Sequence, residues 1–166
     1  MSISEESAFS SIAGELRQTV DAALVNLHSI ADAQSARPLA PGKWSPKQVI
    51  GHLIDSAANN HQRFVRAQQT PALEFPGYQQ DLWVGCQRYE DRGWAELVGF
   101  WHAYNQHLAH VVGQIPEARR NVPCTIGANA AVTLGFLAHD YLVHLEHHLA
   151  QLRADRRPAE GSIIGE

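Results

Sequence analysis

The sequence predicts an all-α protein with the fold of a four-helix bundle. Four long segments place apolar residues at steps of three and four, which is the spacing of an amphipathic helix. No segment has a convincing strand pattern. The connections are unequal, with a long one between the second and third helices, and this argues against a plain up-down-up-down arrangement.

The first helix is expected at about residues 5–30, where one apolar stripe recurs along the segment. The stripe consists of Ile12, Leu16, Val20, Leu24 and Leu27. The helix is expected to end in the loop ADAQSARPLAPG, because small residues and prolines interrupt helical patterns.

The second helix has the clearest start signal, in the run Trp44-Ser45-Pro46-Lys47-Gln48. Ser45 is a good N-cap, and proline is tolerated at the first helical position because its missing N–H would be unpaired there anyway. Gln48 stands where the partner of a capping box belongs. The helix is expected to continue until Thr70-Pro71.

Residues 71–92 form a long connection that is expected to contain a short helix within YQQDLWVGCQRY. The third helix is expected at about 94–115, before Pro116, and the fourth at about 131–152. The loop between them is expected to hold a little extended structure, and the tail DRRPAEGSIIGE to be loosely packed.

Length and composition indicate one globular domain over residues 1–166. Apolar residues make up 45% and charged residues 18%, and the net charge of −4 argues against nucleic acid as a partner. The acidic start MSISEES does not resemble a signal peptide, and no apolar run reaches the roughly 20 residues that span a bilayer. We therefore expect a cytoplasmic protein with no membrane partner.

The ten histidines are the unusual part of the composition. His144 and His148 are four residues apart, so on a helix both imidazoles leave the same face. His52 lies among apolar residues of the second helix, where its side chain should point inward, and is the best third ligand. Three imidazoles would hold a divalent ion such as Zn, Ni, Fe or Mn and leave positions open for water or substrate. The alternative is a solvated histidine pair beside an ordinary core histidine.

Two further residues are candidates for catalysis. Asp55, three residues after His52, would act as a general base or as an acceptor behind the metal ligands, or would be a surface carboxylate. Tyr141, one turn before His144, would donate to a bound oxyanion or would belong to the core. Arg63 would anchor a substrate carboxylate or phosphate, or form a structural salt bridge. Asp140 and Gln151 lie near the stripe of His144 and are candidates for outer-shell or substrate-facing groups.

Two motifs resemble the DinB/YfiT-like superfamily of proposed metalloenzymes. The run WSPKQVIGHLIDS at residues 44–56 resembles the family's second-helix signature, and HLEHHLAQ at 144–151 resembles its fourth-helix signature. The run YQQDLWV at 78–84 is similar to a recurrent stretch of the family. The resemblance implies an up-down-down-up bundle, a metal bound by His52, His144 and His148, and a homodimer. It also implies a small-molecule substrate and, by analogy with some members, a low-molecular-weight thiol cosubstrate such as bacillithiol or mycothiol.

Three functional hypotheses follow. The leading one is a metal-dependent thiol S-transferase or hydrolase, whose ion activates a thiol or water against a small electrophile. The second is a non-catalytic, stress-related bundle in which the same metal is structural. The third is a bundle whose function is dimerisation or partner binding through exposed apolar faces.

Overall fold

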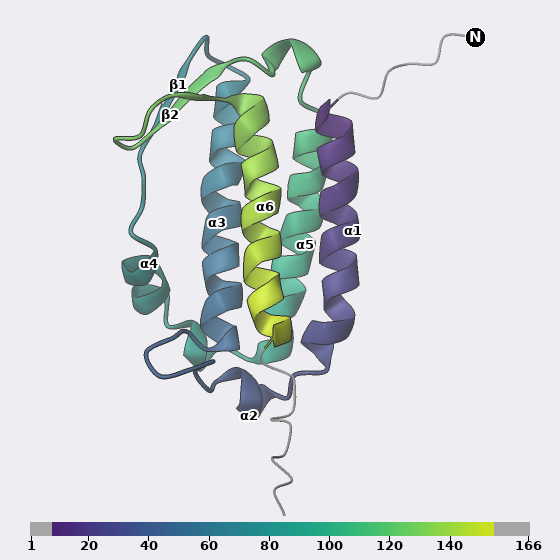
Figure 1. The fold of residues 1–166 in the computed structure, drawn as a ribbon, viewed down its shortest axis with the longest axis vertical. Helices are drawn as coiled ribbons and strands as arrows, with labels where there is room; N and C mark the ends of the chain where they lie inside the picture. Colours follow the sequence, from purple (N-terminus) through teal and green to yellow (C-terminus); the bar gives the residue numbers. More distant parts are fainter. Residues whose placement is uncertain (1–7, 155–166) are drawn as a thin grey trace, which may run out of the picture.

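Four long helices form a bundle in the computed structural model, which describes residues 8–154 (Figure 1). They are α1 (Ala8–His28), α3 (Pro46–Ala67), α5 (Trp94–Gly113) and α6 (Leu134–Ala154). The predicted all-α four-helix bundle is therefore confirmed. The expected start of the first helix at residue 5 and the tail after residue 154 lie outside the described residues.

The helix directions follow the up-down-down-up order. In Figure 1, α1 runs from the top of the bundle to the bottom, α3 and α5 both run upward, and α6 runs down again. Consecutive helices α3 and α5 are parallel because the connection between them returns along the whole length of the bundle. This connection contains α4 (Gln80–Gln87), as the sequence predicts, and a 3₁₀ turn at Tyr89–Asp91.

A small sheet caps the upper end of the bundle (Figure 1). The sequence predicted a little extended structure in the loop that contains β2, but it did not predict the other two strands or their pairing. Strand β1 (Leu73–Phe75) pairs in parallel with β2 (Pro123–Ile126), and β2 pairs antiparallel with β3 (Val132–Thr133). Strands of two to four residues are too short for a recognisable alternating pattern. The parallel pair joins the α3–α5 connection to the α5–α6 connection, so the sheet ties the two loops together.

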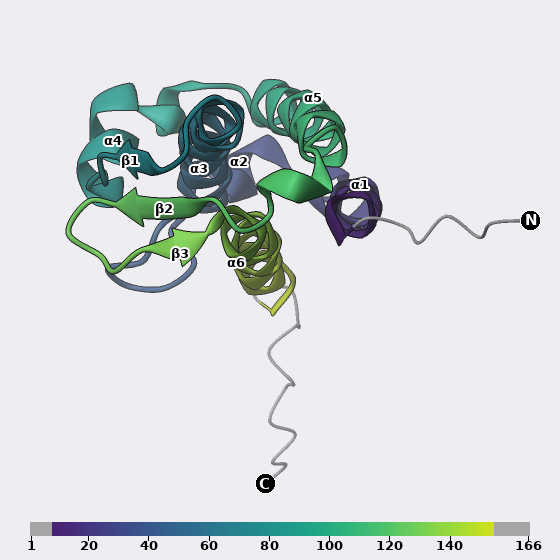
Figure 2. The ribbon, with the colours of Figure 1, turned by 90° about the horizontal axis from the view of Figure 1, so that it is seen from above.

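The core consists of the apolar stripes of the four helices. The stripe of α1 is buried at Leu16, Val20 and Leu27, and Trp101 of α5 is fully buried opposite it. α1 packs mainly on α5, whereas α3 contacts both α5 and α6. The view from above shows α3 beside α6, which brings the two histidine-bearing segments together (Figure 2).

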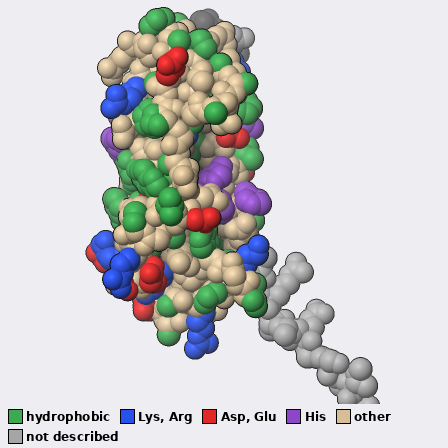
Figure 3. All heavy atoms as spheres, turned by 90° about the vertical axis from the view of Figure 1, so that its left-hand side faces the viewer, with side chains coloured by type: hydrophobic (Ala, Val, Ile, Leu, Met, Phe, Trp, Pro, Cys, Tyr) green, Lys and Arg blue, Asp and Glu red, His purple; other side chains and the backbone are tan. Residues whose placement is uncertain are grey.

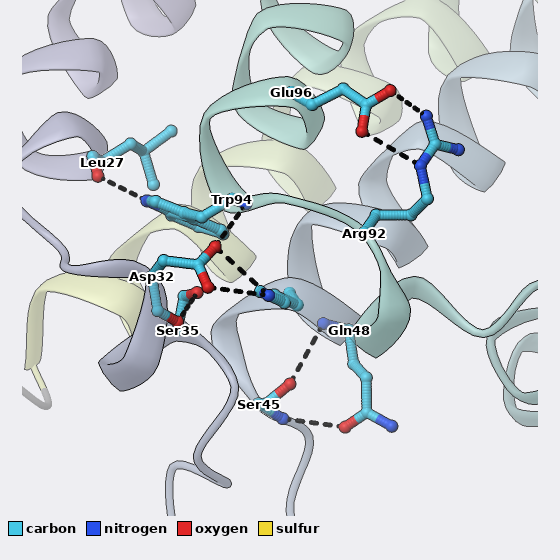
Figure 4. A network of polar contacts seen from close by, with 9 residues as sticks. Leu27, Asp32, Ser35, Ser45, Gln48, Arg92, Trp94 and Glu96 are labelled. Carbon is cyan, nitrogen blue, oxygen red and sulfur yellow. Dashed lines mark hydrogen bonds and ion pairs between the residues drawn. The ribbon is translucent and has the colours of Figure 1, made fainter.

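The predicted capping box starts α3. Ser45 Oγ accepts a hydrogen bond from the backbone N–H of Gln48 at 3.3 Å, and Gln48 Oε1 accepts one from the backbone N–H of Ser45 at 2.9 Å (Figure 4). Two backbone donors at the helix start are thereby satisfied. The cap fixes the residue at which α3 begins. It therefore also fixes the position of His52 along the helix.

A polar network closes the lower end of the bundle around Asp32, in the short helix α2 (Asp32–Ser35) (Figure 4). Its carboxylate accepts from the backbone N–H of Trp94 at 2.8 Å and pairs with Lys47 at 3.3 Å. The Trp94 indole donates to the carbonyl of Leu27 at 2.9 Å. These contacts connect the starts of α3 and α5 to the end of α1. Of the helices within residues 8–154, none combines the length and apolar character that a bilayer crossing requires.

Candidate metal centre

Three histidine side chains from two helices meet in the bundle. His52 lies on α3 with only 1% of its surface exposed, and His144 and His148 lie one turn apart on α6, both partly buried. One ring nitrogen from each of the three lies within 4.8 Å of the others. The sequence predicted this convergence from the four-residue spacing and from the apolar surroundings of His52.

The Nε2 atoms of His52 and His144 lie 3.1 Å apart. Two imidazole ligands of one tetrahedral zinc ion, each about 2.05 Å from it, would be about 3.4 Å apart. The ring of His148 lies 4.7 Å from that of His52 and 4.6 Å from that of His144, between centroids. The spacing of the donors therefore fits a shared divalent ion.

The environment keeps these imidazoles neutral. Burial, and then the neighbouring His148 and His144, lower the pKa of His52 to about 3. Burial, and then His148 and His147, lower the pKa of His144 to about 4. The pKa of His148 is lowered as well, mainly by burial. Neutral imidazoles are the form that binds metal, so near pH 7 the cluster has its lone pairs available.

Gln151 orients His148 within the cluster. Its Oε1 accepts from His148 Nδ1 at 3.1 Å, and its Nε2 donates to His147 Nε2 at 3.2 Å. With the proton on Nδ1, the Nε2 lone pair of His148 is left free to face the other two histidines. His147 therefore accepts a hydrogen bond from the Gln151 amide and is not a fourth member of the cluster.

Trp44 covers His52 from one side, with ring centroids 5.0 Å apart. The sequence marked Trp44 only as the residue before the helix cap. The Nδ1 atoms of His52 and His144 are buried and have no hydrogen-bond partner among the described residues. Packing under Trp44, rather than a second hydrogen bond, therefore holds the His52 ring.

Two hollows adjoin the histidine cluster. One, of about 250 Å³, is lined by His52 and His144 together with Arg63, Asp140 and Tyr141. The other, of about 660 Å³, is lined by Trp44, His148 and Gln151. Figure 3 shows histidine side chains gathered beside a recess on this face of the molecule. A small molecule can therefore reach the cluster.

Asp55 is buried, but its hydrogen bonds lead away from the histidines. Its Oδ1 accepts from Tyr89 Oη at 2.6 Å and from Gln87 Nε2 at 2.7 Å. Burial raises the pKa of Asp55, and the two hydrogen bonds oppose that shift. Gly51 allows this arrangement, because a Cβ there would lie 2.1 Å from the Tyr89 ring. The contacts of Tyr89 and Gln87 with Asp55 were not predicted, because no local sequence pattern relates the α3–α5 connection to α3.

Tyr141 lines the smaller hollow, but its hydroxyl already donates to Asn105 Oδ1 at 2.5 Å. Burial raises its pKa strongly, so the phenol stays protonated. Donation to a substrate oxyanion would require it to leave Asn105. Asp140, which the sequence placed near the same stripe, lines this hollow too, whereas Asp55 does not.

The fold and the cluster together define a helical bundle with a three-histidine centre reached by hollows on its surface. The model of the DinB superfamily matches residues 15–152, and the chain belongs to that superfamily. A curated protein of Oceanobacillus iheyensis, described as a "putative metal-dependent hydrolase", is 20% identical over 127 residues, covering 76% of this chain and 73% of that protein. YfiT from Bacillus subtilis, described as "a probable metal-dependent hydrolase with an unusual four-helix bundle topology", matches with a TM-score of 0.79. That match has 18% identity and covers 93% of this chain and 88% of YfiT.

Proposed function

We propose that the protein is a metal-dependent hydrolase of a small electrophilic substrate, with its divalent ion held by His52, His144 and His148. The observation that carries the proposal is the approach of three imidazoles from two helices, with two Nε2 atoms 3.1 Å apart. Two similar proteins, described as a "putative" and a "probable" metal-dependent hydrolase, support it. A divalent ion in such a site lowers the pKa of water and polarises a carbonyl or phosphoryl oxygen.

The chain's own residues would supply binding and proton handling. Gln151 keeps the Nδ1 proton on His148, and Trp44 shields His52 from bulk water. Asp140 is the carboxylate that lines the hollow beside His144, so we propose it, rather than Asp55, as the group that accepts a proton from the attacking water. Asp55 would then serve to hold Tyr89 and the connection against α3.

Transfer to a low-molecular-weight thiol is the second reaction expected from the sequence. It uses the same three histidines and differs in the nucleophile that enters the hollow. The expected homodimer, the cytoplasmic location and the single domain over residues 1–166 also stay predictions.

The test combines metal analysis with a hydrolysis assay. Protein loaded with Zn²⁺, Ni²⁺ or Mn²⁺ is assayed against a panel of chromogenic esters and phosphate esters, with and without added thiol. We expect near-stoichiometric metal and metal-dependent turnover, both lost in His52→Ala and His144→Ala. The control is His110→Ala, which removes an exposed histidine of α5. Metal retained in both triad variants, or turnover equal to that of the wild type, would reject the proposal. A rate that requires added thiol would select transfer over hydrolysis.

A further inference from the structure

Arg63 of α3 is a buried cation without an anionic partner. Only 9% of its surface is exposed, and among the described residues no aspartate or glutamate forms an ion pair with it. Arginine is rarely buried unless it is paired, because removing the charge from water is costly. The structural salt bridge that the sequence suggested for Arg63 is therefore not formed within residues 8–154.

The remaining contacts of Arg63 leave most of its donors unused. Its Nη1 donates to Asn60 Oδ1 at a long 3.3 Å, and its guanidinium lies 5.5 Å from the centroid of the Phe75 ring. Its Nε is buried with no hydrogen-bond partner among the described residues. A guanidinium has five N–H donors in a planar fork, which matches the oxygen pair of a carboxylate or phosphate.

Asn60 holds this fork in one orientation. Its Nδ2 donates to the carbonyl oxygen of Ser56 at 2.9 Å, so its Oδ1 is turned toward Arg63. The side chains of Asn60 and Arg63 are both buried. The guanidinium is thus positioned before any ligand arrives, which lowers the entropic cost of binding one.

Arg63 lines the same hollow of about 250 Å³ as His52 and His144. It lies about three helical turns, or roughly 16 Å, beyond His52 along α3. The contact with Asn60 shows that its side chain leans back toward the helix start, which shortens the distance to the histidines. One small molecule can therefore have one end at the histidine cluster and the other at Arg63.

We infer that Arg63 binds an oxyanion of the substrate, so that the substrate class is a small molecule with a carboxylate or phosphate at one end and the reacting group at the other. The inference rests on the proposed function for the reacting end, but the anion site stands on the Arg63 contacts alone. Tyr78 and Ser56 line the same hollow and add two hydroxyl groups to its wall. Asp140 also lines it without pairing with Arg63, and its charge favours a substrate that presents only one anionic end.

The test is a calorimetric titration of the full chain, metal-free and zinc-loaded, with glutaramate (the monoamide of glutarate, with one carboxylate), phenyl phosphate and the neutral glutaramide. We expect glutaramate or phenyl phosphate to bind the metal-free protein and glutaramide not to bind. Arg63→Gln should lower the affinity for the anion by about 10- to 100-fold, the effect of losing a charged hydrogen-bond pair. Arg63→Lys should retain part of the affinity. The matched control, Arg66→Gln, removes an exposed arginine of the same helix and should change nothing. Which of the two anions binds identifies the substrate's oxyanion.

Thermal unfolding of the same variants separates an anion site from a structural role. Since Arg63 has no ion pair to lose, Arg63→Gln should unfold at the same or a higher temperature than the wild type. A large drop in the midpoint, failure to fold, or equal anion binding in wild type and Arg63→Gln would overturn the inference. The proposed function fails separately: His52→Ala should lose metal and still bind the anion, whereas Arg63→Gln should keep its metal.

Discussion

At the scale of single residues, Gln151 shows how a side chain outside the cluster orders it. It accepts from His148 and donates to His147, so its amide decides which nitrogen of His148 faces His52 and His144. Residues that orient metal ligands in this way contribute substantially to metal affinity.

We therefore expect Gln151→Leu to lower zinc affinity by about 10- to 100-fold without unfolding the protein, as measured by competition with a chromogenic chelator. The matched control is Gln18→Leu, which changes an exposed glutamine on α1. Equal affinity in Gln151→Leu and wild type would show that packing alone orients His148.

Asp140 and Asp55 offer a direct comparison of two carboxylates on the two histidine-bearing helices. Asp140 lines the hollow beside His144, while Asp55 Oδ1 is occupied by Tyr89 and Gln87. In a hydrolysis assay of the zinc-loaded protein, Asp140→Asn should lower kcat by about 100-fold or more, the usual contribution of a general base. Asp55→Asn should mainly lower the midpoint of thermal unfolding. A large loss of kcat in Asp55→Asn and none in Asp140→Asn would instead assign the general base to Asp55.

Protonation of the cluster makes the metal-free protein sensitive to mild acid. His52 has a pKa of about 3 in the folded chain and an ordinary value of 6.5. Below 6.5 the unfolded chain therefore binds a proton that the folded chain does not, and stability falls as the pH falls toward 3. The loss is at most about 1.4 kcal/mol per pH unit for this one group.

Urea unfolding of metal-free protein at pH 7.5 and 5.5 measures this loss. This interval lies above the usual range of the carboxylates, so the histidines dominate it. His52→Gln, which has no titrating group at this position, should have a shallower pH dependence than the wild type. A wild-type stability that is constant over the interval would mean that the His52 pKa is not depressed.

At the scale of elements, α3 depends on two local features at its start and its first turns. The capping box fixes where the helix begins, and Gly51 gives the Tyr89 ring room to lie against the helix. The contact connects the end of the α3–α5 connection to the turn that contains His52.

We expect Gly51→Ala to lower the free energy of unfolding by about 1–3 kcal/mol, because the added Cβ would overlap Tyr89. Gly14→Ala is the matched control, since Gly14 lies inside α1 with nothing within 4 Å of its Cβ position. That change should be stabilising by up to about 1 kcal/mol, the helix propensity of alanine over glycine. Similar effects of the two changes on urea unfolding would contradict the close approach of Tyr89.

At the scale of the whole molecule, a metal ion bound by the three histidines would cross-link α3 and α6. An ion held by both helices binds the folded chain better than the unfolded one, so it should stabilise the bundle. Zinc at about 100 times its Kd should contribute about 2.7 kcal/mol and raise the midpoint of thermal unfolding by several degrees.

Scanning calorimetry with zinc and then with a chelator tests this cross-link. The rise should be absent in the double variant His144→Ala/His148→Ala and present in His110→Ala. An equal rise in all three proteins would mean that zinc binds elsewhere.

The sequence by itself predicted the four helices, the cap of α3 and the convergence of His52, His144 and His148, whose role as metal ligands stays a prediction. These features depend on neighbours three or four residues apart, which local spacing records directly. The up-down-down-up order came from the resemblance of the two histidine motifs to the superfamily. Only the tertiary structure showed that Trp44 packs against His52. It also showed that Tyr89 and Gln87 both donate to Asp55 Oδ1. Finally, it placed Arg63, which has no ion pair among the described residues, in a hollow shared with His52 and His144. It also decided the small sheet at the upper end. Each of these contacts depends on how the connections and the side chains pack in three dimensions, and no periodicity in the chain records that packing.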